Sequence, residues 1–171
     1  MVLGSVRIVV LLGAALAAGC ASVSGSTLVP GKSTAADVEA LMGAPAEKMS
    51  DAGDNLWWYP RQPYGRQTYL VRLGADGLVK NVEQRLTRQT IAQLRPGMTA
   101  KDVRLWVGPP ANVTRLPVVE RDVWEYRWSD LDWMRLWVQF GYDGVVREVL
   151  AMDDPDRFAF PEGPGCASIL C

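Results

Sequence analysis

The chain has 171 residues, a formal net charge of −1 and no histidine. The missing imidazole removes the usual general base, the commonest metal ligand and both familiar hydrolase triads, so we do not expect an enzyme. A charge this close to zero offers no electrostatic footprint for nucleic acid. Neither a phosphate-binding loop nor a dinucleotide fingerprint is present, and we predict no cofactor.

Residues 1–19 are typical of a secretory signal peptide, because Arg7 precedes an apolar run over 8–18 that is shorter than the roughly 20 residues of a membrane-spanning helix. The run ends in Leu16-Ala17-Ala18-Gly19-Cys20, which resembles the lipobox of bacterial lipoproteins, although Ala17 stands where Leu is usual. The resemblance implies acylation of Cys20 and, with Ala21 next, an anchor in outer-membrane lipid, facing the periplasm. The alternative is an ordinary secretory peptide that leaves Cys20 as a plain thiol.

The other two cysteines lie at the end of the chain. In an oxidising compartment we expect Cys166 and Cys171 to form a disulfide that clips the tail, the alternative being two free thiols. Cleavage before Cys20 removes Arg7 and no acid, so 17 of the 18 basic residues and all 19 acidic residues remain, a formal charge of −2.

The remaining chain contains one unit twice. Matching landmarks recur at offsets of 65 to 67 residues, which chance does not maintain: Leu28-Val29-Pro30-Gly31 with Leu94-Arg95-Pro96-Gly97, Gly43-Ala44-Pro45 with Gly108-Pro109-Pro110, Trp57-Trp58-Tyr59 with Trp124-Glu125-Tyr126, and Asp76-Gly77 with Asp143-Gly144. We therefore divide the chain into a signal peptide (1–19), a linker (20–27), a first, degenerate repeat (28–86), a second repeat (87–150) and an irregular tail (151–171).

Each repeat is predicted to begin with a short helix. Thr34-x-x-Asp37 and Thr99-x-x-Asp102 resemble capping boxes, and Gly43 and Gly108 stand at the helix ends. Apolar residues at i, i+3 and i+4 predict one buried stripe on each helix: Val38, Leu41, Met42 and Val103, Trp106, Val107. The second repeat also has an extra helix predicted over 87–94.

A meander of three strands follows each helix. The strands are predicted over 56–59, 67–73 and 78–82, and again over 123–128, 134–140 and 145–149. Asp76-Gly77 and Asp143-Gly144 are typical of tight hairpin turns, because such turns need positive φ.

The pattern Leu-x-Pro-Gly-Met-Thr-x-x-Asp-Val, Gly-Pro-Pro, Trp-x-Tyr and Asp-Gly-x-Val over 94–149 resembles the SmpA/OmlA (BamE-like) family of outer-membrane lipoproteins, with a degraded copy over 28–82. The resemblance implies an α+β fold of two tandem BamE-like units, each with a short helix or helix hairpin on a three-stranded antiparallel sheet. The tandem architecture also resembles the β-lactamase inhibitory protein, a secreted binder that presents its sheet surface to an enzyme.

The two-residue period of strands assigns the faces of each sheet. The aromatic and aliphatic residues in phase with Trp57 and Trp124 should face the helices: Tyr59, Tyr69, Val71 and Leu73, and Tyr126, Leu136, Val138 and Phe140. The opposite faces then carry a candidate partner surface, formed by Trp58, Leu70, Arg135, Trp137 and Gln139. The alternative is that the repeats pack on each other and bury Trp58, Leu70 and Trp137 between them.

Three functions follow from these features. The first is a non-catalytic scaffold or accessory factor in outer-membrane protein assembly or envelope integrity, whose implied protein partners are barrel-assembly subunits. The second is an inhibitor or sequestering protein for an envelope enzyme. The third is a purely structural lipoprotein, which burial of both Trp58 and Trp137 would favour.

Overall fold

The computed structural model describes residues 24–158. The signal peptide, Cys20, Cys166 and Cys171 lie outside the described residues, so the predictions made for them stay predictions. Among the described residues, no helix is both long and apolar enough to pass through a membrane.

The described part is mostly β. Two separate four-stranded sheets follow the chain order, and every neighbouring pair of strands is antiparallel. The first sheet contains β1 (Glu47–Asp51), β2 (Asp54–Pro60), β3 (Thr68–Leu73) and β4 (Val79–Gln84); the second contains β5 (Asn112–Leu116), β6 (Arg121–Ser129), β7 (Trp133–Gly141) and β8 (Val146–Asp153).

The predicted fold class, tandem BamE-like units with three-stranded sheets, is therefore wrong. The strands that were missed, β1 and β5, each form one edge of a sheet, and most of their side chains are exposed. An edge strand without a buried face has no need of the apolar alternation from which strands are predicted. In addition, β8 runs beyond residue 150, where the second repeat was predicted to end.

The two main helices begin and end in the same way. In α1 (Ala35–Met42) and α3 (Ala100–Val107), the N-cap threonine accepts from the third helical N–H while the aspartate side chain accepts from the N-cap N–H. Gly43 and Gly108 then adopt φ of +83° and +80°, which ends each helix. A shorter helix, α2 (Arg88–Ile91), is capped by Thr87 and precedes α3.

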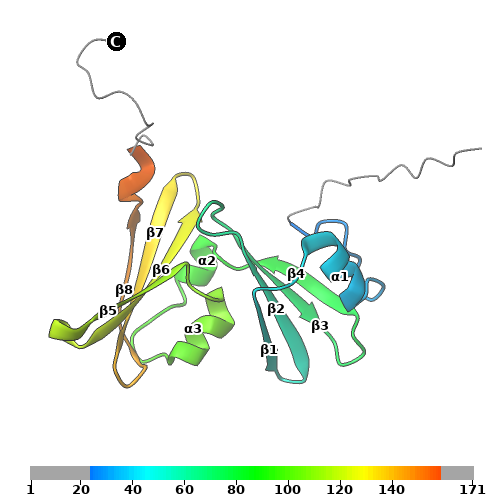
Figure 1. Cartoon of the computed structure of the whole chain (residues 1–171), viewed down its shortest axis with the longest axis horizontal. Coiled ribbons are helices and arrows are strands. Elements are labelled where there is room, and N and C mark those ends of the chain that lie inside the picture. Colours follow the sequence, from blue (N-terminus) through cyan, green and yellow to red (C-terminus); the bar gives the residue numbers. More distant parts are fainter. Residues whose placement is uncertain (1–23, 159–171) are drawn as a thin grey trace, which may run out of the picture.

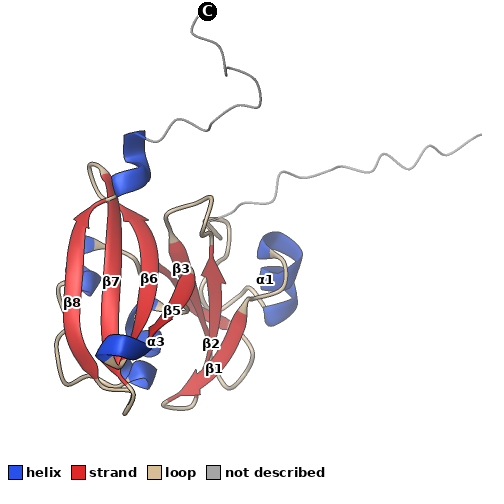
Figure 2. Ribbon diagram, turned by 60° about the vertical axis from the view of Figure 1, so that its left-hand side comes forward, coloured by secondary structure: helices blue, strands red, loops and turns tan. Residues whose placement is uncertain are grey.

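The helices and sheets form four layers. Figure 1 shows α1 on one side of the first sheet and α2 and α3 between the two sheets, and Figure 2 shows the sheets side by side. The first repeat packs α1 on Trp57, Tyr59, Val71 and Leu73, and the second packs α3 on Tyr126, Leu136, Val138 and Phe140. These clusters confirm the predicted helix-facing sides of both sheets.

The repeats are joined by a third apolar cluster. Leu56, Trp58 and Leu70, from the side of the first sheet that faces away from α1, are almost completely buried and pack with Leu105 of α3. Helix α3 thus serves both sheets: Val103 and Val107 contact the second and Leu105 contacts the first. The first sheet is consequently covered by a helix on both faces.

Candidate functional site

Two residues of the predicted partner surface are interior residues. Trp58 is 0% exposed and Leu70 is 1% exposed, so the placement of these two on a free surface is wrong and the alternative, burial between the repeats, holds for them. The contact is close because Gly108 has no side chain: a Cβ there would lie 2.6 Å from Cε3 of Trp58. The phase of the strand was predicted correctly, but the helix that covers it was not.

Arg135 is also withdrawn from the surface, with 8% of its area exposed. Its Nη2 lies 2.6 Å from Oδ1 of Asp154, and Nη1 of Arg66 lies 2.7 Å from Oδ2 of the same carboxylate. Burial alone would raise the pKa of Asp154, but the contact with Arg66, the hydrogen bond from the Asp156 N–H and the positive charges of Arg135 and Arg66 outweigh it and hold the pKa below its ordinary value. This carboxylate joins a loop of the first repeat to the end of the second sheet.

The loop over residues 61–67 contacts the second repeat because its sequence interrupts the strand pairing. Residues 61–67 leave the β2–β3 ladder, whereas the equivalent residues of the second repeat continue the ladder to the turn at 130–132. Pro60 and Pro63 lack the N–H that a ladder requires. Gln62 in the loop instead accepts from the backbone N–H of Arg127, and the Arg66 guanidinium lies 4.2 Å from the centre of the Trp133 ring.

The second sheet retains one face that residues 24–158 leave uncovered. Its register aligns Val123, Glu125 and Arg127 of β6 with Gln139, Trp137 and Arg135 of β7. These side chains point away from α3, since Leu136 and Val138 point toward it. We call this surface the open face and define it by Val123, Glu125, Trp137, Gln139, Leu150 and Met152, with Arg127 and Arg135 at one end.

Trp137 lies at the centre of the open face and is partly exposed, as is Gln139. Its indole Nε1 donates to Oε2 of Glu125 at 3.2 Å, and the Arg135 guanidinium lies 5.7 Å from its ring centre. Glu125 and Arg135 therefore hold the indole in one orientation before anything binds. A fixed, partly exposed tryptophan with a polar surround is the residue type on which protein interfaces concentrate their affinity.

The arrangement provides binding surface rather than reactive groups. Within residues 24–158, no group of three or more acidic or cysteine side chains is placed to hold a metal ion. Most ionised side chains near the open face have partners, since Glu125 binds Trp137 and both Asp154 and Asp156 bind Arg135. Glu148, opposite Gln139 on β8, has none among residues 24–158. What the face offers is an indole bordered by aliphatic side chains, of which Met152 is 49% exposed.

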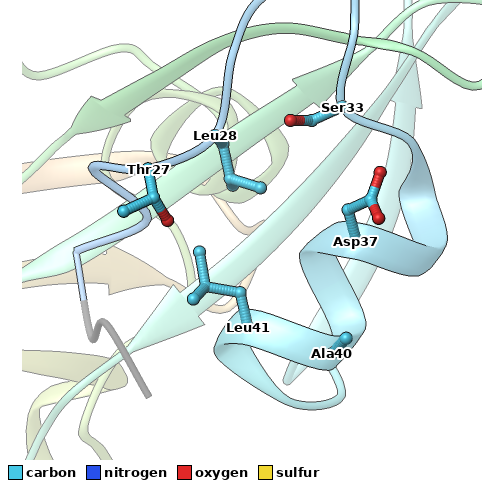
Figure 3. A pocket seen from close by; sticks show the side chains of 6 residues that line it. All are labelled: Thr27, Leu28, Ser33, Asp37, Ala40 and Leu41. Atoms are coloured by element: carbon cyan, nitrogen blue, oxygen red, sulfur yellow. The ribbon is translucent and has the colours of Figure 1, made fainter. Parts of the chain in front are cut away.

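A hollow of about 400 Å³ lies beside α1 in the first repeat. Figure 3 shows Leu28 and Leu41 on its two sides, with Asp37 near Ser33. The Asp37 carboxylate accepts from the backbone N–H and Oγ1 of Thr34 at 2.7 and 2.9 Å, and these hydrogen bonds lower its pKa. The acid is thus used to cap the helix, and the hollow gains no chemistry from it.

No family model matches the chain, and no curated protein matches it. Solved structures that are similar in fold include a DUF4309 family protein (YjgB) of Bacillus subtilis (20% identity, 75% of this chain and 83% of that chain, TM-score 0.28). Others are a putative β-lactamase inhibitor protein from Streptococcus mutans (10%, 71% and 83%, 0.33) and an extracellular protein with an SCP domain from Bacillus anthracis (16%, 74% and 44%, 0.29).

A putative β-lactamase inhibitor protein is thus among the similar structures, and no comparison supports the SmpA/OmlA family. TM-scores this low carry no argument about function.

Proposed function

We propose that this chain is a non-catalytic binding protein of the bacterial envelope, which sequesters or inhibits another envelope protein by covering part of it with the open face. One observation carries the proposal. Leu56, Trp58 and Leu70 of the first sheet are buried under α3, while the equivalent Val123, Glu125 and Trp137 of the second sheet have no cover among residues 24–158.

The covered face indicates what the open face binds. A helix covers the first sheet, and it contributes an aliphatic side chain, Leu105, and a residue without a side chain, Gly108, where the indole of Trp58 packs. The open face has the same arrangement of strands, but its indole lies on a different strand. Trp137 of β7 is equivalent to Leu70 of β3, whereas Trp58 lies on β2. The proposed occupant is therefore a helix of a partner protein with a small residue opposite Trp137.

A second copy of this chain fits the open face poorly. Head-to-tail stacking would place α1 where α3 lies, with Ala40 at the position of Leu105. It would also replace the ion pair between Arg104 and Glu47, 2.6 Å apart, by Glu39 facing Asn112. The stacked copy would lose both the aliphatic contact and the charge pair, so we assign the face to a different protein.

The anchor at Cys20 belongs to this proposal. A lipid-anchored chain whose mature form begins at Cys20 holds the first repeat near the membrane, because residues 21–23 add roughly 10 Å even when fully extended. Labelling with radioactive palmitate tests the anchor: the full-length chain should incorporate label and Cys20→Ser should not. Equal incorporation by both chains would show that Cys20 is not the acylated residue.

The binding function is tested in two steps. A photoreactive amino acid at Leu150 of the full-length chain should crosslink a particular envelope protein that the same probe at Val29, on the first repeat, does not. That protein is then purified and titrated with the full-length chain. We expect micromolar or tighter binding, about tenfold weaker binding by Trp137→Ala, and loss of activity if the partner is an enzyme.

Tyr64→Ala is the matched control, since Tyr64 is an aromatic residue that is 99% exposed and lies outside the open face. Its binding should equal that of the unaltered chain. Crosslinks that are the same at Leu150 and Val29, or a purified partner that binds Trp137→Ala unchanged, would exclude the open face as the binding surface and favour a purely structural role.

A further inference from the structure

Trp106 is an exposed tryptophan in the region between the two repeats. The helical stripe predicts it to be buried with Val103 and Val107, but 40% of its area is exposed. Trp106 is exposed because α3 lies between the two sheets and packs one side on each. Leu105 and Val107 therefore point toward opposite sheets, and Trp106 points out between them. A single exposed indole is common on protein surfaces, so the cavities that Trp106 lines, and not its exposure, indicate a site.

Two cavities meet at this indole. One has a volume of about 420 Å³ and is lined by the β4–α2 connection and α2, including Gln84, Arg85, Gln89 and Gln93. The other has a volume of about 460 Å³ and is lined by the segment before α3, including Arg95, and by Asp102 in the first turn of α3. Trp106 lines both cavities, so its ring lies between them and offers a flat surface to a ligand that occupies either one.

The first cavity is rich in unused amide groups. The Oε1 atom of Gln84 is buried and has no hydrogen-bond partner among residues 24–158, while its Nε2 donates to the carbonyl of Leu86. Gln89 and Gln93 lie four residues apart, both are exposed, and neither side chain makes a hydrogen bond with another group among residues 24–158. Each glutamine amide offers two donors and an acceptor, the combination that a hydroxyl group satisfies in either direction.

The charged side chains of the first cavity are paired with each other, whereas Arg95 of the second cavity has no ion pair among residues 24–158. Arg85 donates to Oε2 of Glu83 at 2.8 Å and to the carbonyl of Trp106 at 2.8 Å, and its guanidinium lies 5.2 Å from the Trp106 ring. Asp102 is used by the N-cap of α3, where its hydrogen bonds with Thr99 lower its pKa. The first cavity thus has no spare charge for an anion or a cation, and too many amides for a purely apolar ligand.

We propose that Trp106 and the glutamines beside it form a binding site for a neutral saccharide. The C–H bonds on one face of a pyranose ring carry partial positive charge and pack on the electron-rich face of an indole. The ring hydroxyls of the same sugar then exchange hydrogen bonds with the exposed amides of Gln89 and Gln93. Cavities on both sides of the indole provide room for further sugar units of an oligosaccharide.

This inference is independent of the proposed function. Trp106 lies on α3, between the sheets, whereas the open face lies on the opposite side of the second sheet. A protein partner and a glycan can therefore be bound by different surfaces of the chain. One site can fail its test without changing the result for the other.

The test is calorimetric titration of the full-length chain with three neutral tetrasaccharides: β-1,4-linked N-acetylglucosamine, β-1,4-linked glucose and α-1,4-linked glucose. We expect saturable binding of at least one of them with a dissociation constant below about 1 mM. Trp106→Ala should weaken that binding at least about tenfold, and Gln89→Ala combined with Gln93→Ala should weaken it several-fold. Trp106→Phe should retain part of the affinity.

Trp133→Ala is the matched control, because Trp133 is 50% exposed and also has an arginine against its ring, yet lies at the other end of the second repeat. It should bind like the unaltered chain. The proposal is overturned if no tetrasaccharide saturates the chain below about 10 mM, if Trp106→Ala binds unchanged, or if tetraethylene glycol, a flexible polyether without sugar hydroxyls, binds equally well.

Discussion

The two repeats have the same capping boxes, the same helix ends and the same hairpin turns, yet their sheets differ in what covers them. The first sheet has α1 on one face and α3 on the other, so Trp58 is completely buried. The second sheet has α3 on one face and the open face on the other. A repeated unit with a helix on one side can bury its free face only against the next unit, and the last unit in an array has none.

Substitution of the central indole in each repeat should produce the largest contrast. Trp58→Ala removes a fully buried side chain from between the repeats, and we expect a loss of about 3 to 5 kcal/mol in the free energy of unfolding. Trp137→Ala removes a partly exposed indole, and we expect a loss of about 1 kcal/mol or less. Equilibrium unfolding in urea measures both, and similar losses would contradict the difference in cover.

The buried ion pairs that join the repeats come next. Asp154→Asn should reduce the free energy of unfolding at neutral pH by about 2 to 4 kcal/mol, because it leaves Arg66 and Arg135 without their shared carboxylate. The folded pKa of Asp154 lies below its ordinary 3.8, so the contribution is present above that pH and disappears as the pH falls through the folded pKa. The difference between the two chains should therefore shrink below about pH 4.

Asp122→Asn is the control for this substitution. Asp122 also pairs with an arginine of the second repeat, but Arg115 is 69% exposed, and such pairs contribute little. Melting temperatures of both variants and the unaltered chain, measured from pH 7 to pH 3, test the prediction. A difference for Asp154→Asn that stays constant across this range would show that its carboxylate does not act through its charge.

The glycines that end α1 and α3 separate backbone strain from packing between the repeats. Both have φ near +80°, so an alanine at either position should cost about 1 to 2 kcal/mol. A Cβ at Gly43 would meet nothing within 4 Å, but a Cβ at Gly108 would collide with Trp58. Gly108→Ala should therefore cost about 1 to 3 kcal/mol more than Gly43→Ala in urea unfolding. Equal costs would mean that Trp58 can move away from α3.

The sequence predicts local features well because their causes are local. Thr99 and Asp102 form the predicted capping box, and Asp76 accepts from the N–H of Leu78 in the predicted hairpin turn. The side of each strand that faces its helix also follows from the two-residue period. By contrast, the exposed edge strands β1 and β5 carry no apolar alternation that would predict them.

The surface residues show where such reasoning ends. The period correctly places Trp58 and Trp137 on the sides of their sheets that face away from their own helices, but it says nothing about the cover that only Trp58 receives from the next repeat. Arg135 of β7 forms ion pairs with Asp154 and Asp156, which follow β8, and Asp154 also pairs with Arg66 of the other repeat. These partners depend on tertiary contacts, as does the exposure of Trp106.

The smallest contrast concerns a hydrogen bond that both repeats have. The hydroxyl of Tyr59 donates to the carbonyl of Gly43 at 3.2 Å, and that of Tyr126 donates to the carbonyl of Gly108 at 3.1 Å. Burial raises the pKa of Tyr59 to about 12 and raises that of Tyr126 further, so both remain protonated donors at neutral pH. The two carbonyls differ, because Gly43 is exposed and Gly108 is buried.

Removal of each hydroxyl should reveal this difference. After Tyr59→Phe, water can reach the carbonyl of Gly43, and we expect a loss of about 0.5 kcal/mol in the free energy of unfolding. After Tyr126→Phe, the buried carbonyl of Gly108 loses the hydrogen bond from Tyr126 and water does not replace it. We expect a loss of about 2 kcal/mol in the free energy of unfolding. Losses in the reverse order would mean that water reaches Gly108, which would require α3 to be less tightly held between the sheets than α1 is at the outer face.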